Sequence, residues 1–199
     1  MKTALVLALT ILIAPMAFAG DEDSVEANPA AYADSQVVLQ TALGDIVLDL
    51  YPDVAPQHVL SLTKLVNMGF YDSLIFHRVI KETLIQGGCP KGDGTGEGPW
   101  KVPAELSDLQ HVDGTLGMAR KIALNSATSQ FYICLRPMPF LDGKYTVFGH
   151  VADSSSLAVA HKIGMMETTG KVKPPAKPDF PLDPAYIERA YVRGKPAAK

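Results

Sequence analysis

The sequence predicts one mainly-β domain built around a closed sheet. Short runs with the alternating apolar pattern of strands outnumber the helical runs along the chain. The chain has 199 residues and 47% apolar content, which is enough to bury one sizeable core. No internal repeat or low-complexity segment indicates a second domain.

The first 19 residues have the pattern of a secretory signal peptide. Lys2 is basic, residues 4–14 are apolar apart from Thr10, and Ala17–Ala19 offers the small residues of a cleavage site. A membrane anchor is the alternative, but the apolar run is shorter than the roughly 20 residues that a spanning helix needs, and acidic residues follow at 21–23. We therefore expect an exported protein with no stable membrane anchor.

The folded domain is expected over residues 36–194. It follows a flexible leader over 20–35, which is polar and rich in alanine, and precedes a short tail over 195–199. The domain begins with two strand-like runs, 37–41 and 46–51, which a turn containing glycine joins into a hairpin. Apolar and polar residues alternate along the second run, so we expect the hairpin to be half-buried.

The next segment, 56–68, changes to a helical period. Its apolar residues fall on one stripe, Pro56 suits a first helical position and Gly69 suits a stop. The remaining strand-like runs cover 74–80, 83–86, 114–119, 130–135, 145–151 and 185–192, and residues 157–163 predict a second short helix. A glycine-rich loop over 90–99 is long enough to predict a functional loop.

Charge and cysteine content exclude several classes of function. The formal net charge is -3 and no long run of one sign occurs, so we expect no nucleic-acid partner. The spacing of Cys89 and Cys134 matches no zinc motif, so no metal is expected. An oxidising compartment would allow the two cysteines to pair, and the sequence leaves open whether they do.

Four blocks of residues occur in a characteristic order. They are Phe76-His77-Arg78 with Gln86-Gly87-Gly88 and Gly94-Thr95-Gly96, then 114–120, then Asn125-Ser126 with Ser129-Gln130-Phe131, and finally 141–149. Together they resemble the cyclophilin signature over roughly residues 37–164. The resemblance implies an eight-stranded antiparallel barrel, closed on itself, capped by two α-helices and carrying its ligand groove on the outer face.

The resemblance also implies an enzyme, a peptidyl-prolyl cis/trans isomerase that needs no cofactor. Its partners would be proline-containing unfolded or flexible polypeptides, and nothing in the sequence asks for more than a monomer. The reaction is rotation about the X-Pro amide, which breaks no bond but crosses a barrier of ~18–20 kcal/mol. Uncatalysed exchange takes tens to hundreds of seconds, which is slow enough to limit folding.

Two residues match the catalytic positions of the family. Arg78 matches the catalytic arginine, whose guanidinium can favour a pyramidal prolyl nitrogen and hold the neighbouring carbonyl. Gln86 matches the glutamine that binds a substrate carbonyl. His77 has two interpretations, a general base or a packed histidine. Isomerisation needs no proton transfer, which favours packing.

The resemblance places an apolar proline slot at Thr83, Leu84, Tyr132 and Leu141, with Phe76 nearby. Two of these positions depart from the family pattern, which usually has phenylalanine where Thr83 and Tyr132 stand. Losing a ring at Thr83 removes apolar contact, whereas Tyr132 keeps its ring and adds a hydroxyl.

Further substrate-binding positions match the rim of the groove. They are Gly94, Thr95, Ala119, Arg120, Gln130, Phe140 and Tyr145. The rim residues Gly94, Thr95, Ala119 and Arg120 have a turn or spacing role as their alternative, and Asn125 is equally suited to forming a turn. Phe140 stands in place of a tryptophan and Tyr145 in place of a histidine of animal-type members. This combination resembles bacterial cyclophilins.

Two functions compete for this sequence. The first is isomerisation of X-Pro bonds in exported proteins, which assists their folding. The second is a non-catalytic chaperone or adaptor that holds proline peptides on the same barrel, and the presence of Arg78 and Gln86 argues against it. A hydrolase is a third possibility, but the sequence lacks the usual motifs of serine and metal hydrolases. A bacterial-type cyclophilin with this signal pattern is expected in the periplasm, with secretion or an organelle lumen as alternatives.

Overall fold

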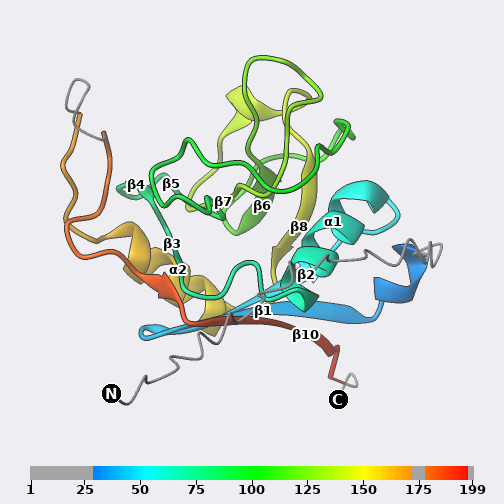
Figure 1. The fold of residues 1–199 in the computed structure, drawn as a ribbon, viewed down its shortest axis with the longest axis horizontal. Coiled ribbons are helices and arrows are strands. Elements are labelled where there is room, and N and C mark those ends of the chain that lie inside the picture. Colours follow the sequence, from blue (N-terminus) through cyan, green and yellow to red (C-terminus); the bar gives the residue numbers. More distant parts are fainter. Residues whose placement is uncertain (1–28, 172–177, 197–199) are drawn as a thin grey trace, which may run out of the picture.

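The protein is described by a computed structural model that covers residues 29–171 and 178–196. Its strands curl around one core with a helix on either side, as Figure 1 shows. The strands are β1 (Ser35–Thr41), β2 (Gly44–Leu50), β3 (Leu74–Ile75), β4 (Arg78–Ile80), β5 (Leu84–Gly87), β6 (Thr115–Met118), β7 (Phe131–Cys134), β8 (Val147–Val151), β9 (Tyr186–Ile187) and β10 (Arg189–Gly194). The helices are α1 (Pro56–Asn67) and α2 (Ser154–Gly164).

Eight strands form one antiparallel sheet in the order β10-β1-β2-β8-β6-β7-β5-β4. Between its two outer strands the described residues show no ladder. Instead, β3, which precedes β4, pairs with β9, which precedes β10, through Leu74 with Ile187 and Ile75 with Tyr186. The predicted eight-stranded antiparallel barrel with two helices is confirmed, and this small second sheet brings its edges together.

Two predicted strands are each broken in the structure. The run 74–80 separates into β3 and β4, and the run 185–192 separates at Glu188 into β9 and β10. Both breaks lie where the chain leaves the small sheet and joins the large one. A corner of this kind interrupts the alternation of side chains that the sequence pattern assumes.

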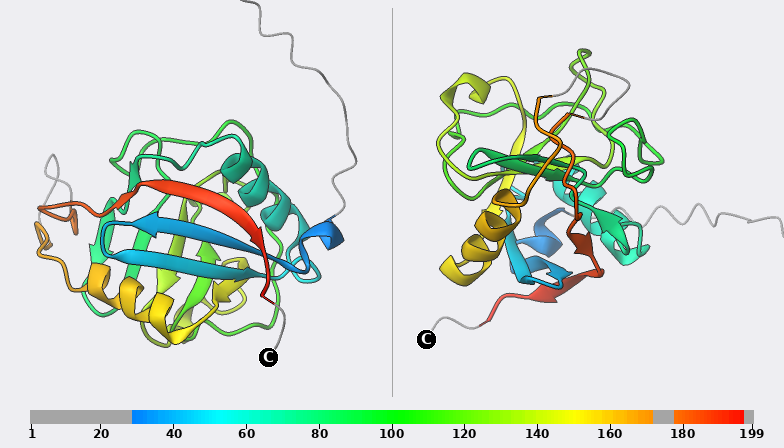
Figure 2. Two further views of the ribbon diagram at one scale, coloured as in Figure 1. Left: turned by 90° about the horizontal axis from the view of Figure 1, so that it is seen from below. Right: turned by 90° about the vertical axis from the view of Figure 1, so that its left-hand side faces the viewer.

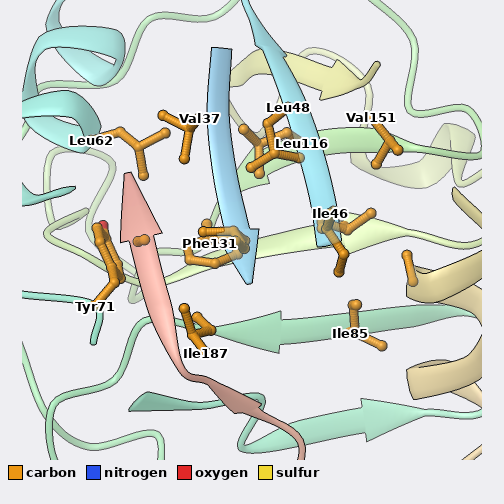
Figure 3. Close-up of a cluster of buried hydrophobic side chains, with 14 of the residues drawn as sticks. Val37, Ile46, Leu48, Leu62, Tyr71, Ile85, Leu116, Phe131, Val151 and Ile187 are labelled. Carbon is orange, nitrogen blue, oxygen red and sulfur yellow. The ribbon is translucent and has the colours of Figure 1, made fainter. Parts of the chain in front are cut away.

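The core fills the inside of the curled sheet (Figure 3). Ile46 and Leu48 of β2, Leu116 of β6 and Phe131 of β7 are fully buried within it. Alternate residues of each strand face inward. The core therefore collects side chains from strands that lie far apart in the sequence. Figure 2 shows β10, β1 and β2 side by side, with α1 and α2 on opposite sides of them.

Carboxylates pair with the unpaired backbone N–H groups at the start of both helices. At α1, the Glu105 carboxylate accepts hydrogen bonds from the backbone N–H groups of Gln57 and His58, each at 3.0 Å. These bonds satisfy donors that the start of a helix leaves unpaired. At α2, Asp153 caps the first turn by accepting from the Ser156 N–H at 2.8 Å.

The folded part of the chain begins before Gln36. Pro29–Tyr32 forms a short 3₁₀ helix, Tyr32 packs against the core, and β1 starts at Ser35. The polar composition of residues 20–35 predicted a flexible leader. The contact of Tyr32 with the core instead holds the end of this segment against the fold. The predicted signal peptide and residues 20–28 lie outside the described residues, as do 172–177 and 197–199.

Cys89 and Cys134 are both buried free thiols in the structure. Burial raises the pKa of the Cys134 thiol to about 12, so it stays protonated at neutral pH. In the two described ranges, no helix has the length and apolar character that crossing a membrane requires.

Removing one buried hydroxyl should loosen α2 from the sheet. The Ser156 Oγ accepts a hydrogen bond from the Val47 N–H at 3.0 Å in a buried position. Ser156→Ala leaves that N–H without its partner and should lower the free energy of unfolding by about 1–3 kcal/mol. Urea unfolding would measure the change. Ser154→Ala, at an exposed position of the same helix, is the control, and equal effects of the two variants would contradict the assignment.

Candidate active site

A row of four residues crosses the outer face of the barrel. In the antiparallel registers, Arg78 of β4 pairs with Gln86 of β5, Gln86 pairs with Tyr132 of β7, and Tyr132 pairs with Gly117 of β6. Directly opposed residues of neighbouring strands point to the same face of a sheet. The register therefore assembles this row from segments that lie up to 54 positions apart, from Arg78 to Tyr132.

Gly117 makes room for the phenol of Tyr132. A Cβ at this glycine would lie 2.3–2.5 Å from the outer atoms of that ring, including 2.4 Å from its hydroxyl oxygen. Such distances are far inside van der Waals contact, so any side chain here would displace the ring. The small residue on β6 is what allows a large aromatic residue on β7.

A cavity of about 380 Å³ opens beside this row. It is lined by Arg78, Ile80, Thr83, Leu84, Gln86, Ala119, Arg120, Tyr132, Met138, Phe140, Leu141 and Tyr145. The structure thus brings together the residues that the sequence predicted for the proline slot, apart from Phe76. It adds Ile80 and Met138, whose apolar character alone gave no signal of a site.

The guanidinium of Arg78 stands between two partners. Its Nη1 donates to the Gln86 Oε1 over a long 3.4 Å, and its Nε lies 3.7 Å from a carboxylate oxygen of Asp179. The Arg78 side chain is 42% exposed, so it borders the cavity and remains open to solvent. Asp179 comes from the segment before β9 and was not predicted, because no local pattern signals a contact over about 100 residues.

Gln86 is oriented by a second glutamine. Its Nε2 donates to the Gln130 Oε1 at 3.0 Å, while the Gln130 Nε2 donates to the carbonyl oxygens of Gly94 and Gly96 at 3.0 and 2.7 Å. These bonds assign the orientation of both amides, since each nitrogen faces an acceptor. The Gln86 carboxamide is therefore held in place beside Arg78.

A smaller cavity of about 130 Å³ adjoins the first one. The two share Gln86, Ala119 and Arg120. The remaining lining residues are Gly94, Glu97, Lys121, Ser126, Thr128 and Gln130. The predicted positions Gly94 and Gln130 thus lie next to the slot, in a more polar compartment.

Arg120 braces the wall between the cavities. Its guanidinium lies 4.7 Å from the ring centroid of Tyr145 and donates to the carbonyl oxygens of Lys121, Ile122 and Lys144 at 2.9–3.1 Å. An arginine can stack on an aromatic ring and use its planar donors at the same time. Phe140 stands at the outer rim and is 60% exposed.

Phe76 and Thr95 lie outside both cavities. Phe76 is fully buried in the core, edge-on to Phe131 at 6.2 Å, which corrects its expected place at the slot. The break between β3 and β4 turns it inward while Arg78 turns outward. Thr95 bonds through its N–H and hydroxyl to Asp93 at 2.8 and 2.7 Å, a turn role. Asn125 also braces a loop, accepting from the Ala104 N–H at 3.0 Å.

His77 is a packed histidine. Its ring is buried, and a Cβ added at Gly94 would lie 3.5 Å from it. Burial, followed by the positive charge of Arg78, lowers the pKa of His77 to about 4. The ring is therefore neutral at pH 7 and does not line either cavity.

The chain has clear relatives among known proteins. Residues 36–191 match the family model for cyclophilin type peptidyl-prolyl cis-trans isomerase. A peptidyl-prolyl cis-trans isomerase of Synechococcus elongatus is 45% identical over 129 residues, covering 65% of this chain and 88% of the relative. One from Schizosaccharomyces pombe is 40% identical over 161 residues, covering 78% and 97%.

The fold is also found among solved structures. The crystal structure of a Cryptosporidium parvum cyclophilin type peptidyl-prolyl cis-trans isomerase, in the presence of the dipeptide Ala-Pro, superposes with a TM-score of 0.69 at 28% identity. The match covers 80% of this chain and 99% of that one. With the family model spanning most of the barrel, the chain belongs to the cyclophilin-type peptidyl-prolyl cis-trans isomerases.

Proposed function

We propose that this isomerase acts on X-Pro bonds of exported proteins and that Arg78 and Gln86 carry its catalysis. The observation that supports these roles is the position of the Arg78 guanidinium, at the edge of a largely apolar cavity and beside a fixed carboxamide. A prolyl ring needs an apolar enclosure, and the amide next to it needs polar contacts. This arrangement offers both side by side.

The reaction requires stabilisation of a twisted amide. Resonance between the nitrogen lone pair and the carbonyl creates the ~18–20 kcal/mol barrier, and it is lost when the bond rotates. The nitrogen becomes pyramidal and able to accept a hydrogen bond. A donor aimed at that nitrogen stabilises the transition state more than the planar ground state, which is the condition for catalysis.

Arg78 fits the donor role and Gln86 the holding role. The guanidinium is always charged and has five N–H donors, of which one is engaged by Gln86 over 3.4 Å and another faces Asp179. Its other donors can approach the prolyl nitrogen and the preceding carbonyl. Gln86 adds a polar contact for a flanking carbonyl, which keeps one side of the bond fixed while the other rotates.

The apolar cavity fits the prolyl ring. Leu84, Tyr132, Met138 and Leu141 are among its apolar lining residues. Thr83 also borders it, with its hydroxyl bonded to the Lys81 carbonyl oxygen at 3.0 Å. The Cryptosporidium cyclophilin in the presence of Ala-Pro supports a proline-containing substrate for this chain as well.

The proposed compartment is the periplasm. The support for it is the sequence pattern of residues 1–19, with a basic start, an apolar run and small residues at a cleavage site. Uncatalysed isomerisation is slow enough to delay folding. An exported isomerase would act on chains that fold after translocation.

Arg78→Ala should abolish most of the acceleration of a short X-Pro peptide. We expect kcat/KM to fall by about 100-fold or more because the donor to the twisted amide is lost. The assay follows cis/trans exchange with residues 20–199, and circular dichroism checks the fold. Arg193→Ala, on β10 and not among the residues that line the cavity, is the control. A folded wild type that binds the peptide without accelerating its exchange would favour the non-catalytic module.

Asp179→Asn should reduce turnover moderately. The carboxylate lies beside the Nε of Arg78, and asparagine tolerates the positive φ of 54° at this position while removing the charge. We expect kcat/KM to fall about two- to fivefold, as for a partly exposed ion pair, and added salt should slow the wild type more than the variant. The exposed neighbour Asp183→Asn is the control, and an equal salt response in all three proteins would refute the pairing.

His77→Leu should change acid stability rather than turnover. The unfolded chain takes up a proton near an ordinary histidine pKa of about 6.5, whereas the folded chain does so only near pH 4. The wild type therefore loses stability as the pH falls through this window, at up to about 1.4 kcal/mol per pH unit.

Urea unfolding across this pH range should show a smaller loss in the His77→Leu variant than in the wild type. Turnover at pH 7 should be kept, because no proton is transferred in the reaction. A folded variant with more than tenfold lower kcat at pH 7 would show that the imidazole takes part in catalysis.

A further inference from the structure

A hydrogen-bonded chain with two buried members and a partly exposed end, Asp142, lies behind the proposed proline slot. The Asp142 carboxylate accepts from the backbone N–H of His111 and meets its ring Nδ1, both at 2.8 Å. The other ring nitrogen of His111, Nε2, lies 2.8 Å from the hydroxyl of Tyr132. The His111 side chain is fully buried and Tyr132 is 5% exposed. The chain joins the turn after residue 141 to the wall of the slot.

The direction of these hydrogen bonds follows from the charges. The hydrogen bonds from the His111 backbone and ring hold the pKa of Asp142 below its usual range, so its carboxylate is ionised and accepts. The Nδ1 of His111 must then donate, and in the tautomer that carries its proton on Nδ1 the other nitrogen, Nε2, is an acceptor. Burial raises the pKa of Tyr132 well above its usual range, so its phenol keeps its proton and donates to Nε2.

The contacts around the Tyr132 ring leave it little freedom. It stacks on the His111 ring with centroids 6.0 Å apart and an interplanar angle of 18°, and it meets Tyr145 edge-on at 6.2 Å. Gly117 leaves the gap that receives the hydroxyl end. The hydroxyl oxygen lies on the axis of the torsion that turns the ring, so the bond to His111 fixes the position of the far end of the ring. The stacked and edge-on contacts fix the plane of the ring, whose torsion has broad preferences of its own.

We propose that His111 and Asp142 are positioning residues for substrate binding, which hold the Tyr132 ring as a fixed wall of the slot. The proposal rests on the placement of the prolyl ring in this cavity. Thr83 supplies little apolar surface at the same site, so prolyl binding depends more on the position of the aromatic residues that line it, of which Tyr132 is the most buried. Neither positioning residue lines the cavity, so each acts through Tyr132.

A purely structural role is the competing explanation. The His111 carbonyl oxygen accepts from the Met138 N–H at 2.7 Å, so this residue also holds the segment that enters the slot. Loss of that support would lower stability and would not depend on the hydroxyl of Tyr132. The two explanations therefore differ in whether an effect on KM requires that hydroxyl.

The test compares two substitutions at one position. In His111→Gln the side-chain amide can reach the place of Nε2 and accept from Tyr132, whereas the shorter side chain of His111→Asn reaches only the place of Nδ1. In the X-Pro exchange assay with residues 20–199, we expect His111→Asn to raise KM about threefold to tenfold, the loss of one hydrogen bond. The kcat should stay within about twofold, and His111→Gln should keep KM within about twofold.

Tyr132→Phe removes only the hydroxyl and should raise KM by the same factor as His111→Asn. In the Tyr132→Phe background, His111→Asn should have no further effect on KM, because the two changes break one interaction. His161→Asn, a half-exposed histidine on α2, is the control and should leave KM unchanged.

The positioning role would be overturned if His111→Asn raised KM equally in the wild type and in the Tyr132→Phe background. It would also be overturned if Tyr132→Phe alone left KM unchanged, and this measurement does not require His111→Asn to fold. In both cases the proposed function would stand as long as the wild type accelerates exchange. A folded wild type that does not accelerate exchange would instead overturn the proposed function itself.

Discussion

The antiparallel register of β4, β5, β7 and β6 is the constraint on which the site depends. It places Arg78, Gln86, Tyr132 and Gly117 in one row on the outer face, although they come from four separate segments. A slip by one residue in any of these pairs would turn the side chains of that strand to the other face. The core prevents this, because the same slip would expose residues such as Val79, Ile85 and Ile133, which are now buried. Packing inside the barrel therefore secures the chemistry outside it.

The reaction explains why the site has this composition. Rotation about an amide transfers no proton and breaks no bond, so an ordinary histidine base or an activated nucleophile would have no task. The proposed mechanism needs a permanent donor, a fixed polar contact and an apolar surface. Arg78 cannot lose its charge, Gln86 is held by Gln130, and His77 is kept neutral at pH 7 by burial and by Arg78. None of these groups has to change its protonation state in the proposed reaction.

Local patterns predicted most of the elements, and the family resemblance predicted much of the slot. The hairpin, both helices and most strand segments follow from apolar periodicity and turn residues, whereas Thr83, Leu84, Tyr132 and Leu141 came from the resemblance and Ile80 and Met138 were not predicted. The errors have a common cause. The inward turn of Phe76 depends on a strand break, and the pairing of Arg78 with Asp179 depends on a chain return about 100 residues later. The residues next to Phe76 and Arg78 give no sign of the strand break or of the ion pair, because both depend on how distant segments of the chain meet. The same holds for the contact of His111 with Tyr132.

The two departures from the family pattern have linked physical consequences. Threonine at position 83 lowers the apolar contact that the slot can offer, while tyrosine at 132 brings a hydroxyl that burial makes costly unless it finds a partner. His111 provides that partner, Asp142 orients the histidine, and Gly117 leaves the space for the larger ring. A phenylalanine at 132 would need none of these bonds, and its ring would be held by packing alone. In the proposed role the hydroxyl bond holds the far end of the Tyr132 ring in one position, which matters more in a cavity where threonine at position 83 supplies no ring of its own.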